Sequence, residues 1–180
     1  MRIIREEAAA VVIDIQEKLL PHIDGGEILL SNCLKLIEGL KILSVPVIIT
    51  QQYTNGLGPT VPSIIEIFPQ FRFIEKISFS CWEELAFKNE ISRLNKTDII
   101  LCGIETHVCV LQTCIDLLAE GKKPLVVDDC VSSRRPEDKR VAIERMRQEG
   151  ARITTVESLL FELTRIAGNQ IFKSISNIVK

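Results

Sequence analysis

The chain has 180 residues, 46% of them hydrophobic, and carries a formal net charge of −2 at pH 7. A chain of this length buries roughly 70% of the surface that it exposes when unfolded, so we expect one domain over residues 1–180. Acidic and basic residues are interspersed, and no apolar run reaches the ~20 residues that cross a bilayer, which argues against nucleic acid and membranes as partners.

Short apolar, β-branched runs alternate with amphipathic segments along the whole chain. The strand-like runs cover residues 8–15, 45–50, 71–77, 97–104, 124–129 and 151–156. Helical patterns cover about 28–43, 83–94, 108–120, 136–149 and 157–166, and residues 169–180 have the apolar spacing of a terminal helix. Continuous apolar strands joined by helices predict a three-layer α/β/α sandwich with a mostly parallel, Rossmann-like six-stranded sheet.

The longest segment without a regular pattern is 51–63, directly after the second strand. Its glycines and prolines, Gly56, Gly58, Pro59 and Pro62, are expected to prevent regular structure. The segment should therefore lie as a loop at the edge of the sheet where the strands end. Open parallel sheets bind ligands at that edge.

Reactive side chains are found at three strand ends. Asp14 ends the first strand, Lys76 ends the third, and Cys109 follows the fourth. Because the carboxyl ends of parallel strands share one edge, a carboxylate, an ammonium and a thiol from distant positions can converge there. Each signal also has a plain structural reading: Asp14 as a cap of the next loop, Lys76 as a lysine reaching solvent, and Cys109 as a core thiol.

Cys109 carries the more specific signal, because a polar turn precedes it and an apolar helix begins at about the cysteine itself. The positive end of a helix dipole and a neighbouring ammonium would lower the pKa of a thiol from about 8.5 into the range of roughly 4–7.5. We therefore expect Cys109 to be a reactive thiolate. Free backbone N–H groups of the same turn could hold the oxyanion of a tetrahedral intermediate.

The six cysteines are expected to be reduced, because the charged N-terminal segment lacks the features of a cleavable secretory signal. We predict a cytoplasmic protein on the same ground. No Cys-x-x-Cys pair is present, and His22 and His107 are far apart in sequence. The sequence therefore predicts neither a metal site nor a cofactor.

At this point the sequence resembles the isochorismatase-like cysteine hydrolase superfamily, and most closely its branch of isochorismatase domain-containing proteins. The resemblance covers nearly the whole chain and is carried by VPVIITQQY, GLGPTVP, the EK and FS of 75–80, LCGIETHVCV, VSSR and ERMRQEGA. It implies a catalytic triad of Asp14, Lys76 and Cys109. It also implies a cis peptide bond between Ile104 and Glu105, and an oxyanion hole made by the backbone N–H groups of Glu105 and Cys109.

The departures from the family concern the substrate. Nicotinamidases hold a metal through an Asp-x-His pair after the second strand, whereas this chain has Gln51, Gln52 and Tyr53 there. Isochorismatases that hydrolyse a vinyl ether often lack the nucleophilic cysteine, which is present here as Cys109. The expected reaction is therefore metal-independent hydrolysis of a small amide, carbamoyl compound or ester through a thioester on Cys109.

Candidate pocket residues complete the prediction. Gln16, Gln51, Gln52 and His107 could orient a polar substrate, and Tyr53, Phe79 and Trp82 could form apolar walls. Proteins that resemble this one usually associate, so we expect a homo-oligomer with a small-molecule substrate. The alternatives are a catalytically silent scaffold on the same fold, a vinyl-ether hydrolase and, more remotely, a redox protein or a nucleotide-binding oxidoreductase.

Overall fold

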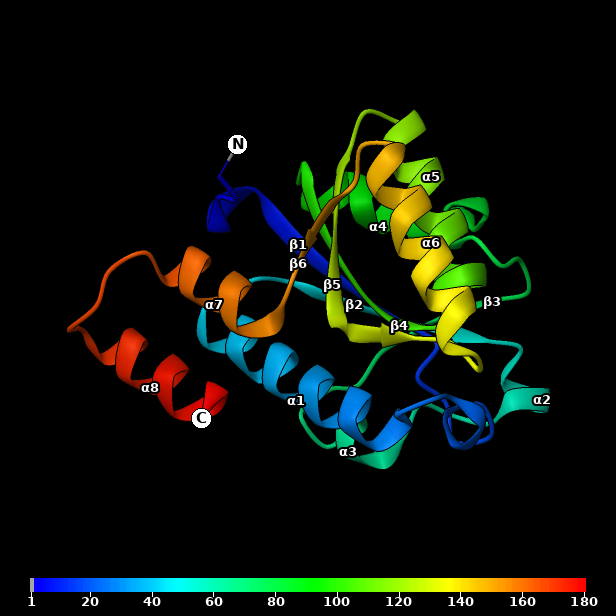
Figure 1. Cartoon of the computed structure of the whole chain (residues 1–180), viewed down its shortest axis with the longest axis horizontal. Coiled ribbons are helices and arrows are strands. Elements are labelled where there is room, and N and C mark those ends of the chain that lie inside the picture. The colour runs from blue at the N-terminus through cyan, green and yellow to red at the C-terminus, as the bar shows by residue number, and fades with distance from the viewer. Residues whose placement is uncertain (1) are drawn as a thin grey trace.

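The structure, a computed structural model, describes residues 2–180, which form a six-stranded sheet with helices on both faces (Figure 1). All five neighbouring strand pairs are parallel, in the order β3-β2-β1-β4-β5-β6. The strands are β1 (Ala8–Ile13), β2 (Val47–Gln52), β3 (Ile74–Lys76), β4 (Asp98–Ile104), β5 (Lys123–Ser132) and β6 (Arg152–Thr154). The predicted six-stranded sheet is confirmed.

The helices form the two outer layers (Figure 1). One layer contains α1 (Gly26–Ile42), α7 (Val156–Thr164) and α8 (Gln170–Val179), and the other contains α4 (Leu85–Leu94), α5 (Leu111–Ala119) and α6 (Pro136–Gln148). Short elements complete the chain: η1 (Arg5–Glu7), η2 (Leu20–His22), α2 (Thr54–Leu57), α3 (Pro62–Ile65), η3 (Cys81–Glu83) and η4 (Thr106–Val110). The α/β/α sandwich is therefore confirmed.

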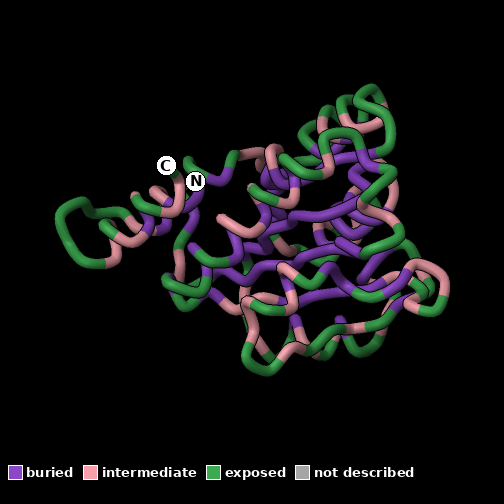
Figure 2. The backbone as a smooth tube through the Cα atoms, turned by 90° about the horizontal axis from the view of Figure 1, so that it is seen from below, coloured by how far each residue is buried: buried purple, intermediate pink, exposed green. Residues whose placement is uncertain are grey.

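The central strand β1 shows why its sequence is apolar at every position. Ala8, Ala10 and Val12 face the core under α1, whereas Ala9, Val11 and Ile13 face the core under α4 and α5. Successive residues of a strand point to opposite faces, so a strand covered on both sides has no polar face. Figure 2 shows the buried strands running through the interior, with the exposed residues in the peripheral helices and loops.

The segment 51–63 is more ordered than we predicted. Gln51 and Gln52 are the last residues of β2, and two four-residue helices, α2 and α3, follow within the segment. Pro62 is the first residue of α3, where its missing N–H group has no helical partner to lose. The expectation of a loop without regular structure was wrong, because a proline at this position starts a helix.

Gly103 brings β4 unusually close to β1. Its φ is +119°, and a β-carbon there would lie 2.0 Å from the carbonyl oxygen of Ile13. Only glycine tolerates both the backbone conformation and the contact. β1 and β4 are paired in parallel as far as Ile13 and Gly103, so the two chain segments that carry Asp14 and Cys109 leave the sheet next to each other.

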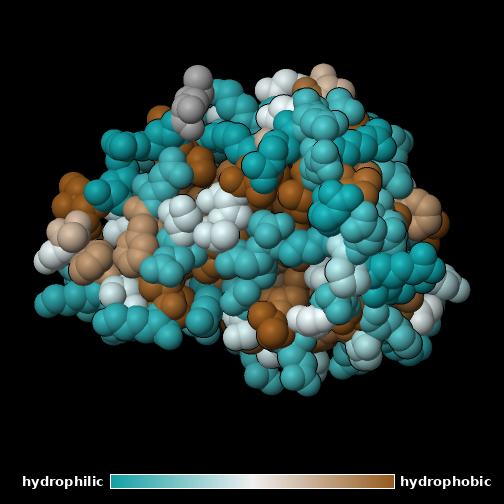
Figure 3. Space-filling view, viewed as in Figure 1, coloured by the Kyte–Doolittle hydropathy of each residue, from teal (hydrophilic) through white to brown (hydrophobic). Residues whose placement is uncertain are grey.

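The terminal helix predicted at 169–180 is present as α8 and packs against α1 and α7. Ile175 is fully buried, and the ring centroids of Phe172 and Phe161 lie 6.0 Å apart. The face seen in Figure 3 is largely hydrophilic, with smaller hydrophobic groups between the polar residues. Among residues 2–180, no helix is long and apolar enough to span a membrane.

Candidate active site

A buried ion pair joins two strand ends at the carboxyl edge of the sheet. Lys76, the last residue of β3, places its Nζ 2.7 Å from Oδ2 of Asp14, and both side chains are fully buried. Asp14 directly follows β1 and has a φ of +54°, which is uncommon for a residue with a side chain. The Thr50 hydroxyl of β2 donates to the other carboxylate oxygen, Oδ1, at 2.7 Å.

The Lys76 ammonium is held by further partners. It donates to Oε1 of Gln52 at 2.6 Å and to the carbonyl oxygens of Ser78 and Phe79 at 3.2 and 3.1 Å. These bonds replace the water that a buried ammonium loses. Removing one partner of such a buried pair leaves an uncompensated charge and costs about 3–5 kcal/mol.

Cys109 lies beside this pair, in the π-helical turn η4 between β4 and α5. Its Sγ is 4.0 Å from Oε1 of Gln52, the same oxygen that accepts from Lys76, and the Asp14 carboxylate is near enough to shift the pKa of its thiol. The three predicted residues are therefore neighbours. The peptide bond between Ile104 and Glu105, immediately before the turn, is cis.

The pKa values of the pair are set by burial and by mutual attraction. Burial raises the pKa of Asp14, and the nearby Lys76 ammonium offsets this only in part. Burial alone would lower the pKa of Lys76, but the attraction of Asp14, followed by that of the Cys109 and Cys81 thiols, raises it instead. Lys76 therefore stays protonated and positively charged, whereas the raised pKa makes Asp14 a stronger base.

The predicted low pKa of Cys109 was wrong. Burial, followed by the repulsion of the Asp14 carboxylate, raises the pKa of the thiol to about 12, and Lys76 opposes this shift only in part. The regular helix α5 begins at Leu111, two residues after Cys109, so the simple helix-start argument did not describe this turn. At neutral pH the resting cysteine is therefore a neutral thiol near a carboxylate base.

Two of the predicted pocket residues are occupied by the backbone around them. Gln16 donates to the carbonyl oxygens of Gln52 and Gly58 and accepts from the N–H of Gln52. Gln51 donates to Thr54 and accepts from both the N–H and the hydroxyl of Thr60. Both side chains are almost fully buried. Gln16 fixes the segment after β1 to the segment after β2, and Gln51 holds the segment after β2 to itself.

The other predicted pocket residues lie around the triad. Gln52 touches both Lys76 and Cys109, as described above. Tyr53 and Phe79 expose 52% and 54% of their surface, while Trp82 is half-buried and packs edge-on against Phe87. His107 precedes Cys109 by two residues in η4, and its Nδ1 lies 2.9 Å from the Ser133 hydroxyl.

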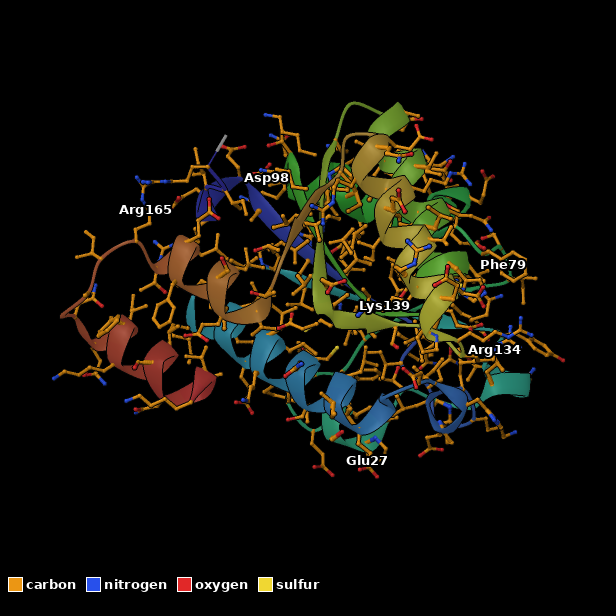
Figure 4. The ribbon with its side chains drawn as sticks, viewed as in Figure 1. Glu27, Phe79, Asp98, Arg134, Lys139 and Arg165 are labelled. Atoms are coloured by element: carbon orange, nitrogen blue, oxygen red, sulfur yellow. The ribbon has the colours of Figure 1, made fainter. Side chains whose placement is uncertain are left out.

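Sequence reasoning missed Thr50 and Arg134. Thr50 pairs with Ile13 across the sheet, so the predicted neighbouring strands already placed its hydroxyl next to Asp14. Arg134 follows β5 and binds Glu105 Oε1 through its backbone N–H at 3.2 Å and its Nε at 2.9 Å. Figure 4 shows Arg134 and Phe79 at the same end of the molecule, away from Asp98 at the start of β4 and from Arg165.

No group of three or more His, Cys, Asp or Glu side chains within residues 2–180 is arranged to hold a metal ion. A hollow of about 750 Å³ is bordered by Glu105, Arg134 and the α2 turn, and so adjoins the turn that carries Cys109. Another, of about 500 Å³, lies between the starts of α1 and α6. The lining of neither hollow includes a triad residue.

Residues 8–158 match the family described as Isochorismatase domain. The chain is 40% identical over 189 residues to the secreted isochorismatase effector Isc1 of Phytophthora sojae, covering 99% of this chain and 87% of the relative. It is 38% identical over 181 residues to isochorismatase domain-containing protein 2A of Mus musculus, covering 99% and 85%.

Solved structures agree with this match. The structure of MAR1 ribonuclease from Caenorhabditis elegans superposes with a TM-score of 0.93 at 36% identity, over 99% of this chain and 92% of that chain. The YcaC gene product of Escherichia coli, described as an octameric hydrolase of unknown specificity, gives a TM-score of 0.93 at 26% identity, over 99% and 89%. The chain thus belongs to the isochorismatase family, in its branch of isochorismatase domain-containing proteins.

Proposed function

We propose that this chain is a metal-independent cysteine hydrolase of small amides, carbamoyl compounds or esters, with Asp14, Lys76 and Cys109 as its catalytic triad. The observation that carries this proposal is the buried Asp14–Lys76 pair, 2.7 Å apart, beside the Cys109 thiol. A lone buried ion pair is weak support for stability, so its position next to a thiol favours a chemical role.

The reaction begins with transfer of the Cys109 proton to Asp14 while the sulfur attacks the substrate carbonyl. The S–C bond forms, the carbonyl π electrons move to oxygen, and Lys76 stabilises the negative charge that appears on the sulfur. The raised pKa of Asp14 suits this step, because a carboxyl that holds a proton more readily is the stronger base.

Collapse of the tetrahedral intermediate breaks the bond to the leaving group, which takes the proton from Asp14. A thioester on Cys109 remains. Asp14 then removes a proton from water, whose oxygen attacks the thioester and releases the acid product, and the proton returns to the sulfur. One carboxyl group thus serves both halves of the reaction.

The oxyanion would be held by the backbone N–H groups of Glu105 and Cys109. Both belong to the turn that starts after the cis peptide bond Ile104–Glu105. The carbonyl oxygen of Glu105 accepts from the N–H groups of Val108 and Val110 at 3.2 Å each, which folds the turn around this residue. A donor of this kind is worth about 10²–10³ in rate.

We further propose a cytoplasmic homo-oligomer. The description of YcaC as an octamer supports self-association. The Phytophthora sojae relative is named a secreted effector, which gives that protein a different location. The location of this chain therefore has to be measured. Sedimentation of the purified chain and imaging of a tagged chain in cells test the two statements separately.

The experiment that tests the function is a screen of small amides, carbamoyl compounds and esters with the native chain and with Cys109→Ala. Turnover that requires Cys109 and a trapped thioester of matching mass would support the hydrolase. Isochorismate and RNA belong in the same screen, because a vinyl-ether hydrolase and the ribonuclease named for the Caenorhabditis elegans structure are the rival activities. Turnover of either by Cys109→Ala would contradict the proposal.

A further inference from the structure

A cavity with a basic rim adjoins the turn that carries Cys109. It has a volume of about 750 Å³, and its charged or titratable lining residues are Lys18, His22, Glu105 and Arg134. Gly56 and Leu57 of α2 and Leu19 form the apolar part of its wall. The cavity is thus formed where the segments after β1, β2, β4 and β5 meet.

The walls of this cavity include the segments that carry two of the triad residues, Asp14 and Cys109. Lys18 lies four residues after Asp14, and its backbone N–H donates to the carbonyl oxygen of Leu57 at 3.1 Å. Glu105 lines the cavity and directly precedes the turn η4 that contains Cys109. Gln16 connects the segment after β1 to Gln52, which contacts Lys76 and Cys109. A ligand in the cavity therefore lies against the segments that follow β1 and β4.

The charges on the rim do not cancel. The only acid in the lining, Glu105, is bound by Arg134, whose side chain remains 61% exposed. Lys18 is exposed and takes part in none of the ion pairs found within residues 2–180. Without counting His22, the basic groups exceed the acidic ones by a single charge. This excess suits a carboxylate monoanion.

We propose that this cavity, with Lys18 and Arg134 on its rim, is the subsite for a carboxylate of the substrate. The substrate class is then a small acyl compound that carries a carboxylate a few bonds from the carbonyl attacked by Cys109. Arg134 has guanidinium N–H groups beyond the Nε that binds Glu105, and a guanidinium matches the two oxygens of a carboxylate. The inference rests on the proposed function for its chemistry but not for its test.

The test uses two alkylating reagents of nearly the same size on the full chain. Iodoacetate carries a carboxylate and iodoacetamide is neutral, so the ratio of their rates at Cys109 measures preference for an anion without requiring turnover. Rates are followed at Cys109 by peptide mass spectrometry at low ionic strength. The ratio for the native chain should fall as salt is added, because mobile ions screen the rim.

Substitution of Lys18 tests whether the preference for the anionic reagent comes from the rim of this cavity. Lys18→Met should lower the iodoacetate to iodoacetamide ratio about threefold, and Lys18→Glu about tenfold, as expected for the loss and the reversal of one charge at a partly hydrated site. Lys173→Met is the matched control, because it removes the same charge from an exposed position on α8. That variant should keep the native ratio.

An unchanged ratio in both Lys18 variants would overturn the subsite, whatever the activity screen finds. A lowered ratio in a chain that hydrolyses nothing would support the subsite and contradict the hydrolase. Melting temperatures of the variants exclude unfolding as the cause of a change in rate. A second measurement compares kcat/KM for a carboxylate-bearing amide and its neutral analogue, and the preference for the charged amide should also fall about threefold in Lys18→Met.

Discussion

Two buried groups of cysteines lie on opposite faces of the sheet. Cys81, Cys109 and Cys114 belong to the core under α4 and α5, whereas Cys33, Cys102 and Cys130 belong to the core under α1 and α7. The pKa of every one of these thiols is raised, chiefly by burial for Cys81, Cys109, Cys114 and Cys130 and by interactions with neighbouring thiols for Cys33 and Cys102. A perturbed pKa therefore does not distinguish a reactive cysteine in this protein.

The neighbours of the two groups differ. Cys33 donates to the carbonyl oxygen of Cys130 and Cys102 to that of Val11, and aliphatic side chains surround them. Cys109 instead contacts a carboxylate, with an ammonium beside it, and it is 6% exposed where the other five thiols are fully buried. Access and a base within reach, rather than acidity, mark the candidate nucleophile.

The largest expected effect is the loss of activity when the cysteine of one core, but not that of the other, is replaced. Cys109→Ala should lower kcat by at least about 10³ with little change in melting temperature, because it removes the nucleophile and leaves the ion pair intact. Cys102→Ala is the matched variant in the other core. It should keep the activity while losing about 1–2 kcal/mol of folding free energy, measured by urea unfolding. Equal activity of the two variants would contradict the assignment.

The second effect concerns the base. Asp14→Asn should lower kcat about 10²-fold, because no group accepts the thiol proton. The same substitution removes the negative charge that raises the pKa of Cys109, so alkylation of Cys109 by iodoacetamide should become faster at neutral pH.

These opposite directions separate a base from a merely structural residue. A fall in both rates would indicate that Asp14→Asn has disturbed the site as a whole, and a melting curve identifies that case. Introduced together with Cys109→Ala, Asp14→Asn should cost little further activity, since both residues act on one proton. Additive losses would contradict a shared mechanism.

The third effect is the pH dependence of labelling. With a pKa of about 12, the Cys109 thiolate fraction should rise about tenfold per pH unit through pH 9, where an unperturbed thiol levels off. Cys33, Cys102 and Cys130 should stay unlabelled until the protein unfolds. Labelling that reaches a plateau below pH 8 would restore the low pKa predicted from the sequence.

The folding stability should depend on the pH through the three thiols of the core under α4 and α5. The folded pKa of Cys81, Cys109 and Cys114 is about 12, above that of an unfolded thiol, so the folded state retains protons that the unfolded state loses. Their stabilising contribution is complete below pH 9 and is lost as the pH rises toward 12. Urea midpoints measured between pH 8 and 11 should fall steadily.

The smallest expected effect is that of metal removal. Gln51 and Gln52 stand where related nicotinamidases have metal ligands, and both amides are bound to protein groups. Treatment with a chelator should leave turnover unchanged. Loss of activity that a divalent metal restores would overturn metal independence.

The sequence by itself determined the architecture. The apolar runs of β1 and β4 allow no solvent-exposed face, and Gly121 and Gly150, which follow α5 and α6, have the positive φ that glycine readily adopts after a helix. Parallel connection of such strands then places their last residues at one edge. For this reason Asp14, Lys76 and Cys109 could be grouped although they are far apart in sequence.

Only the tertiary structure decided the chemistry at that edge. The pKa of Cys109 depends on how deeply it is buried and on which of two opposite charges is nearer, and a helix-start pattern contains neither quantity. Gln16 and Gln51 looked like substrate ligands, but Gln16 is bound by backbone groups of Gln52 and Gly58, and Gln51 by Thr54 and Thr60. The same bonds order residues 51–63. Long-range contacts set these properties, because hydrogen bonding and solvation act through distance in space and not through distance along the chain.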